Sequence, residues 1–101
     1  MPETAFAAAP AGAVPLHALP RGASARIVHL LPAGAGDERE ILLRLIEIGF
    51  LPGESVRVVA TGRAGGEPMA VRLGGQSTFA LRAREAALVR VLPEGAGGEA
   101  A

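Results

Sequence analysis

The sequence predicts a mainly β protein: a small barrel of five short antiparallel strands, with one helix inserted after the first strand. Three observations predict this fold. Apolar and polar residues alternate in short runs along the second half of the chain, glycine-rich turns separate these runs, and a single segment has apolar residues at helical spacing. Such strands favour a barrel, because closure protects strand edges that would otherwise pair with other chains.

The first strand is expected at 25–31, a short segment in which Ile27 and Val28 are β-branched. The helix is expected at 37–48. Asp37 is a candidate N-terminal cap, and Glu40 stands three residues later, as in a capping box. The residues predicted to face the core from this helix are Ile41, Leu42, Leu45, Ile46 and Ile48.

The helix is expected to end at Gly49, in a left-handed conformation that would strain a residue with a β-carbon. Phe50 would then contact Leu45, which is the apolar contact of a Schellman ending. Pro52 prevents the helix from continuing.

Four strands are expected after the helix, because apolar residues recur with a period of two. They lie at 55–60, 69–73, 78–82 and 87–92. A glycine-rich loop at 62–66, the pair Gly74-Gly75 and one helical turn at 83–86 separate them.

The length of 101 residues fits one small domain. Residues 1–14 and 94–101 consist mostly of alanine, glycine and proline, so they cannot bury enough apolar surface to offset their chain entropy. We therefore expect two disordered tails, at 1–14 and 94–101, around a folded domain at 15–93.

Composition excludes several functions. The absence of cysteine removes disulfides and thiolate metal sites, and fits a cytoplasmic location. Three Phe with no Tyr or Trp leave no platform for stacked bases and no aromatic groove for proline-rich peptides. A net charge of zero, with ten Arg and no Lys, argues against a dedicated nucleic-acid binder. No apolar stretch reaches the length of a membrane span.

Catalytic groups are scarce as well. His17 and His29 are the only side chains suited to proton transfer at neutral pH, and neither has an obvious orienting carboxylate. Two histidines are too few for an ordinary zinc site. We therefore expect no enzymatic activity, no substrate, no cofactor and no resident metal.

Two surfaces are candidates for binding. Arg57, Arg72 and Arg82 fall on the polar faces of predicted strands, which indicates either a solvated sheet face or a patch for an acidic partner or a nucleic acid. Leu43 lies off the apolar stripe of the helix and is framed by charges, as in many partner contacts and also on many ordinary surfaces.

Three blocks resemble a known family. Residues 44–56, RLIEIGFLPGESV, are similar to the "RL-x-E-h-G-h-x-P-G-x-x-V" block of ferrous iron transport protein A, FeoA, in which h is apolar. Residues 80–86, ALRAREA, resemble its "A-L-R-x-x-E-A" block, and Leu16, Leu19 and Gly22 resemble its "L-x-x-L-x-x-G" opening. The resemblance covers about 15–93.

This resemblance implies an SH3-like barrel and a cytosolic accessory protein of FeoB, the membrane Fe(II) transporter with a GTP-binding domain. The expected role is to bind and regulate that transporter, at the inner face of the membrane and without catalysis. The residues expected to contact it are Leu43, Arg44, Glu47, Phe50, Leu51 and Arg63. Arg44 is spaced to pair with Glu40 or Glu47, so Arg63 is the freer candidate for an arginine finger in GTP hydrolysis.

Two alternatives stay open at this point. The arginine-lined barrel wall could bind nucleic acid, as other small barrels do. A metal-responsive module that changes shape with Fe(II) is the other alternative. An unprotected strand edge could also support weak self-association.

Overall fold

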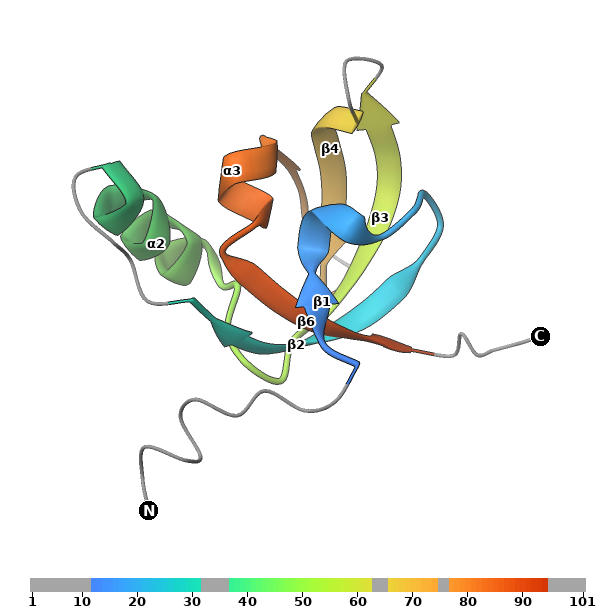
Figure 1. The fold of residues 1–101 in the computed structure, drawn as a ribbon, viewed down its shortest axis with the longest axis horizontal. Helices are drawn as coiled ribbons and strands as arrows, with labels where there is room; N and C mark the ends of the chain where they lie inside the picture. The colour runs from blue at the N-terminus through green and yellow to red at the C-terminus, as the bar shows by residue number, and fades with distance from the viewer. Residues whose placement is uncertain (1–11, 32–36, 63–65, 75–76, 95–101) are drawn as a thin grey trace.

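The computed structural model describes residues 12–31, 37–62, 66–74 and 77–94. Most of the two predicted tails, and Arg63, lie outside the described residues. The elements in chain order are β1 (Val14–Pro15), the 3-10 helix η1 (Leu16–Ala18), β2 (Ser24–Leu30), α2 (Asp37–Ile48), β3 (Ser55–Gly62), β4 (Gly66–Leu73), β5 (Ser77–Leu81), α3 (Ala83–Ala86) and β6 (Val89–Glu94) (Figure 1).

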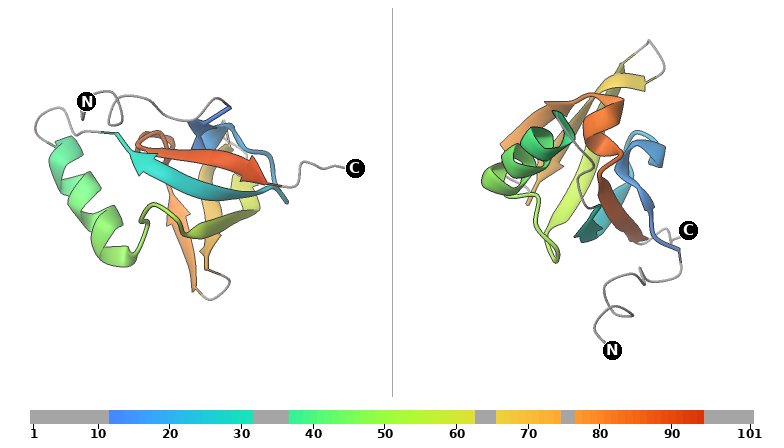
Figure 2. Two further views of the ribbon diagram at one scale, coloured as in Figure 1. Left: turned by 90° about the horizontal axis from the view of Figure 1, so that it is seen from below. Right: turned by 60° about the vertical axis from the view of Figure 1, so that its left-hand side comes forward.

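The strands form one antiparallel sheet in the order β1-β6-β2-β3-β4-β5, and the sheet curls around the core (Figures 1 and 2). The mainly β prediction, with a helix between the first long strand and the rest, is confirmed. The number of strands among the described residues is six rather than five. The additional strand, β1, has only two residues, which is too short to show any periodicity.

β2 pairs with β6 along its whole length but with β3 only at its beginning. Its first residues pair with both β3 and β6, whereas His29 and Leu30 pair with β6 alone. The register with β6 shifts between Ile27 and His29, as at a β-bulge. The backbone of Ile27 also exchanges hydrogen bonds with the turn after α2, at Gly53 and Glu54, at 2.8 and 2.9 Å. This turn therefore ties the C-terminal end of α2 to the sheet.

The core is filled from every strand except the two-residue β1, and from both helices. Its buried apolar residues are Leu16, Leu19, Ala25, Ile27, Ile41, Leu45, Phe50, Val56, Val58, Met69, Val71, Leu81, Ala86, Leu88, Val89 and Val91. Phe50 is among the largest of these, and its ring meets the ring of Phe79 edge-on at 5.9 Å. Leu88 is buried because it precedes β6 rather than alternating outward within it.

Helix α2 occupies the predicted range, and its C-terminal end has the predicted Schellman geometry. Phe50 N donates to Leu45 O at 3.0 Å, Gly49 N donates to Ile46 O at 3.1 Å, and Gly49 has φ +120°. The helix lies at one side of the sheet in all views (Figures 1 and 2). Only Ile41 and Leu45 are buried from its predicted stripe, so placing Ile46 in the core was wrong.

Candidate functional site

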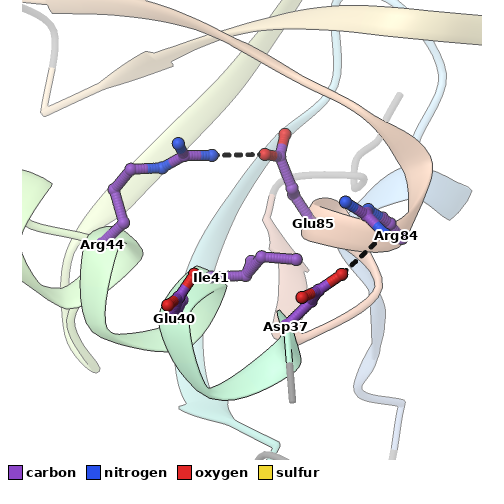
Figure 3. A pocket seen from close by; sticks show the side chains of 6 residues that line it. All are labelled: Asp37, Glu40, Ile41, Arg44, Arg84 and Glu85. Carbon is purple, nitrogen blue, oxygen red and sulfur yellow. Dashed lines mark hydrogen bonds and ion pairs between the residues drawn. The ribbon is translucent and has the colours of Figure 1, made fainter.

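A hollow of about 320 Å³ lies between the first turns of α2 and the short helix α3 (Figure 3). Its lining residues are Asp37, Glu40, Ile41, Arg44, Arg84 and Glu85. The lining is mostly charged, and only Ile41 contributes an apolar floor. The hollow is shallow and lacks an apolar interior, so it does not suit a small organic ligand.

Glu85 accepts hydrogen bonds from both sides of this hollow, one from α2 and one from the residue before α3. Its carboxylate is largely buried, and Arg44 Nη2 donates to Glu85 Oε2 at 2.6 Å. The second oxygen, Oε1, accepts a hydrogen bond from the backbone N of Arg82 at 2.7 Å. A buried carboxylate requires such donors, because its desolvation is otherwise costly. Arg44 therefore pairs with Glu85 and not with Glu40 or Glu47, the partners that its spacing within the helix suggested.

A second ion pair links the same two helices at the surface. Arg84 Nη1 lies 4.0 Å from Asp37 Oδ2, and both side chains are exposed. Figure 3 shows this pair and the Arg44–Glu85 pair on either side of Ile41. The exposed pair adds little stability. The N-terminal end of α3 is held separately, because Ala83 N donates to the carboxylate of Glu67.

The outer surface of α2 carries exposed apolar side chains. Leu43 is 55% exposed, Ile46 39% and Leu51 42%, and no other large apolar residue of the described chain is exposed to this extent. Leu43 and Ile46 are three residues apart, so they share one side of the helix. Leu51 follows directly after the helix ending. We call Leu43, Ile46, Glu47 and Leu51 the α2 surface.

The structure changes the predicted contact set in two ways. Leu43, Arg44, Glu47 and Leu51 are exposed, as predicted for a contact surface, but Phe50 is fully buried. Phe50 must be removed from the set, because the Schellman ending turns its ring onto the core. Ile46 must be added. Its spacing of three residues from Leu43 could have indicated this, but its apolar character placed it in the core stripe.

The predicted arginine wall is only partly formed. Arg57 and Arg72 are direct partners across β3 and β4. Arg82 lies beyond β5, at the opposite end of β4, because the register pairs Leu81 with Met69. The third arginine beside Arg57 and Arg72 is Arg21, which lines the same hollow of about 500 Å³. Sequence periodicity could not find Arg21, because it lies in a turn.

The two histidines do not meet. His17 is exposed on η1 and His29 is half-buried on β2. Among the described residues, no group of three His, Asp or Glu side chains is arranged to hold a metal ion. No helix within the described ranges is long and apolar enough to cross a membrane.

Comparison with known proteins identifies the family. The model of the FeoA domain matches residues 14–93. FeoA of Stenotrophomonas maltophilia, solved with zinc, is 45% identical over 75% of this chain and 86% of its own, with a TM-score of 0.65. It was described as a prokaryotic SH3 domain protein and a candidate activating factor of bacterial ferrous iron transport. No curated protein resembles the chain closely enough in sequence to count as a match.

Two further structures extend the comparison. Iron(II) transport protein A from Clostridium thermocellum is 33% identical, over 81% of this chain and 46% of that one, with a TM-score of 0.65. A manganese-dependent transcriptional repressor has a TM-score of 0.68 at 21% identity, over 84% of this chain and 38% of its own, which shows a shared fold alone. With its SH3-like sheet and a family match over almost all of its described residues, the chain belongs to the FeoA family.

Proposed function

We propose that this protein is a cytosolic, non-catalytic accessory protein of ferrous iron uptake that binds the membrane transporter FeoB and regulates it through its GTP-binding domain. The observation that carries the proposal is the α2 surface. Three large apolar side chains are exposed on one helix and its ending, whereas the other large apolar side chains of the described residues, apart from prolines, are buried or half-buried. Exposed apolar side chains with charged neighbours are typical of partner contacts.

The surroundings of α2 support this role, because they hold the helix in place. The Arg44–Glu85 pair connects α2 to α3, and the Schellman ending ties α2 to the core through Phe50. A contact surface on a rigid element loses little conformational entropy on binding. Arg44 is engaged by Glu85, so its side chain would be a fixed, charge-paired border of the surface.

The experiment is a binding titration of the full chain against the isolated GTP-binding domain of the cognate transporter, with GDP and with a non-hydrolysable GTP analogue. We expect Leu43→Asp to weaken binding at least about tenfold, because it places a charge in the apolar contact. Ala18→Asp, on exposed η1, is the matched control and should bind like the wild type. Absence of wild-type binding in both nucleotide states would refute the proposal.

A further inference from the structure

A second surface, separate from α2, carries three arginines. Arg57 on β3 and Arg72 on β4 stand directly opposite each other, and Arg21, in the turn before β2, lines the same hollow. Within the described part of the chain, none of the three makes an ion pair or a side-chain hydrogen bond. We call Arg21, Arg57 and Arg72 the arginine triad.

The arrangement of Arg57 and Arg72 is unfavourable in the isolated protein. Directly opposite residues of an antiparallel pair have β-carbons about 5 Å apart, and like charges there repel each other. The net charge of the whole chain is zero, so this is a local concentration of positive charge. An anion bound between the two guanidinium groups would remove the repulsion.

The acidic side chain that shares a hollow with two arginines of the triad does not neutralise them. Glu94 borders a neighbouring hollow together with Arg57 and Arg72, but its Oε2 pairs with Arg26 Nη2 at 3.3 Å. The three ion pairs seen between described residues, Arg26–Glu94, Arg44–Glu85 and Arg84–Asp37, each join one arginine to one carboxylate. One carboxylate of this kind could therefore pair with only one of the three arginines.

We propose that the arginine triad is a binding site for a ligand with several phosphate groups. Each guanidinium presents a planar fork of donors that matches phosphate oxygens, and a chain of phosphates offers enough oxygens for all three. The hollow of about 500 Å³ is large enough for such a group. Its other lining residues are Gly22, Val58 and Val59, which give no aromatic ring on which a base could stack.

The chemistry of the site predicts which part of a ligand it recognises. Because the triad offers charge and donors but no stacking surface, inorganic tripolyphosphate should bind about as tightly as GTP or ATP. Binding should weaken steeply with salt, since the site is open to solvent. The site lies on β3, β4 and the turn before β2, and it shares no residue with the α2 surface. Phosphate binding and transporter binding can therefore be tested independently of each other.

The test is isothermal titration calorimetry of the full chain with sodium tripolyphosphate at low ionic strength. We expect saturable one-to-one binding, and at least about tenfold weaker binding for both Arg57→Gln and Arg72→Gln, because each removes charge-assisted hydrogen bonds. Arg39→Gln, an exposed charge on α2, is the matched control and should bind like the wild type. Circular dichroism of each variant establishes that it is folded.

Further ligands separate the sources of phosphate. Comparable affinity for GTP and tripolyphosphate supports the proposal. No binding of tripolyphosphate overturns it, and so does an equal loss in Arg39→Gln, which would indicate diffuse attraction. Binding only to anionic phospholipid vesicles, or only to duplex DNA, also overturns the proposal. The protein would then recognise an extended charged surface and not a compact polyphosphate.

Discussion

Glu85 shows how a single residue can connect two elements that are distant in sequence. One carboxylate oxygen accepts from the Arg82 backbone, and the other accepts from Arg44, which is 41 residues away. Glu40 and Glu47 are closer in sequence, but they are exposed and can be hydrated by water. The buried acid therefore takes the arginine. Helical spacing suggested local partners, and only the placement of α3 beside α2 in the fold could reveal the actual one.

This pairing has a measurable consequence. Arg44→Ala should lower the free energy of unfolding by about 1–2 kcal/mol, because the largely buried Glu85 loses its charged donor. Urea denaturation followed by circular dichroism measures it. Glu40→Gln and Glu47→Gln are controls and should change stability by less than about 0.5 kcal/mol. If either control costs as much as Arg44→Ala, the local pairing is the correct one.

Gly49 provides a second prediction at this scale. Its φ of +120° strains any residue with a side chain, and an added β-carbon would lie 3.3 Å from Leu73 Cδ2. Gly49→Ala should therefore destabilise the protein by about 1–2 kcal/mol. Gly53→Ala is the comparison, because Gly53 has φ +96° and open space around it. Thermal unfolding should show the larger loss at Gly49, and equal losses would mean that Leu73 moves aside freely.

Among the elements, α2 was the most predictable. Its end and its Schellman geometry follow from local sequence, because the terminal glycine and its apolar neighbours act within a few residues. Its orientation was less predictable, and Ile46 shows why. A helix that packs along the narrow line of Ile41 and Leu45 leaves the flank of its apolar stripe exposed. The number of stripe residues that become buried depends on the element that packs against the helix. The apolar stripe alone does not predict the shape of that element.

The strands after α2 were predicted from their alternation, but β1 was not. Val14 and Pro15 form a strand only because β6 offers them a free edge. The register between neighbouring strands could not be predicted from the sequence either. The pairing of Arg57 with Arg72 depends on the register of β3 with β4, and the exclusion of Arg82 depends on that of β4 with β5.

The like-charged pair on β3 and β4 predicts a stabilising substitution. Arg72→Gln should raise the free energy of unfolding by about 0.5 kcal/mol, because it removes repulsion from the directly opposite Arg57. The gain should shrink in high salt, which screens the repulsion in the wild type. Urea denaturation at low and high salt measures both effects. A loss of stability at low salt would show that the two arginines do not oppose each other.

For the whole molecule, the two candidate surfaces are formed by different elements. The α2 surface follows the inserted helix at one side of the sheet, whereas the arginine triad lies over β3, β4 and the turn before β2 (Figures 1 and 2). The family and the barrel could be predicted from the sequence. The separation of these surfaces could not, because it arises from residues that only the fold brings together.

The proposed effect on nucleotide turnover can be assigned to one arginine. Arg44 is held by Glu85, so Arg63 remains the candidate for an arginine finger, although it lies outside the described residues. If the chain stimulates GTP hydrolysis in this way, Arg63→Ala should abolish the stimulation at saturating concentration, whereas Arg44→Ala should retain it. Phosphate-release kinetics measure the rates. Unchanged stimulation by Arg63→Ala would exclude the finger.

We propose the α2 surface as the place where this protein contacts the transporter FeoB. Amide chemical-shift mapping of the isotope-labelled chain, titrated with the transporter's GTP-binding domain, tests it most directly. We predict that the largest changes fall at 41–51, with Leu43, Ile46 and Leu51 among them, and that Leu43→Asp abolishes them. Changes concentrated on β3 and β4 instead, with α2 unaffected, would contradict the claim.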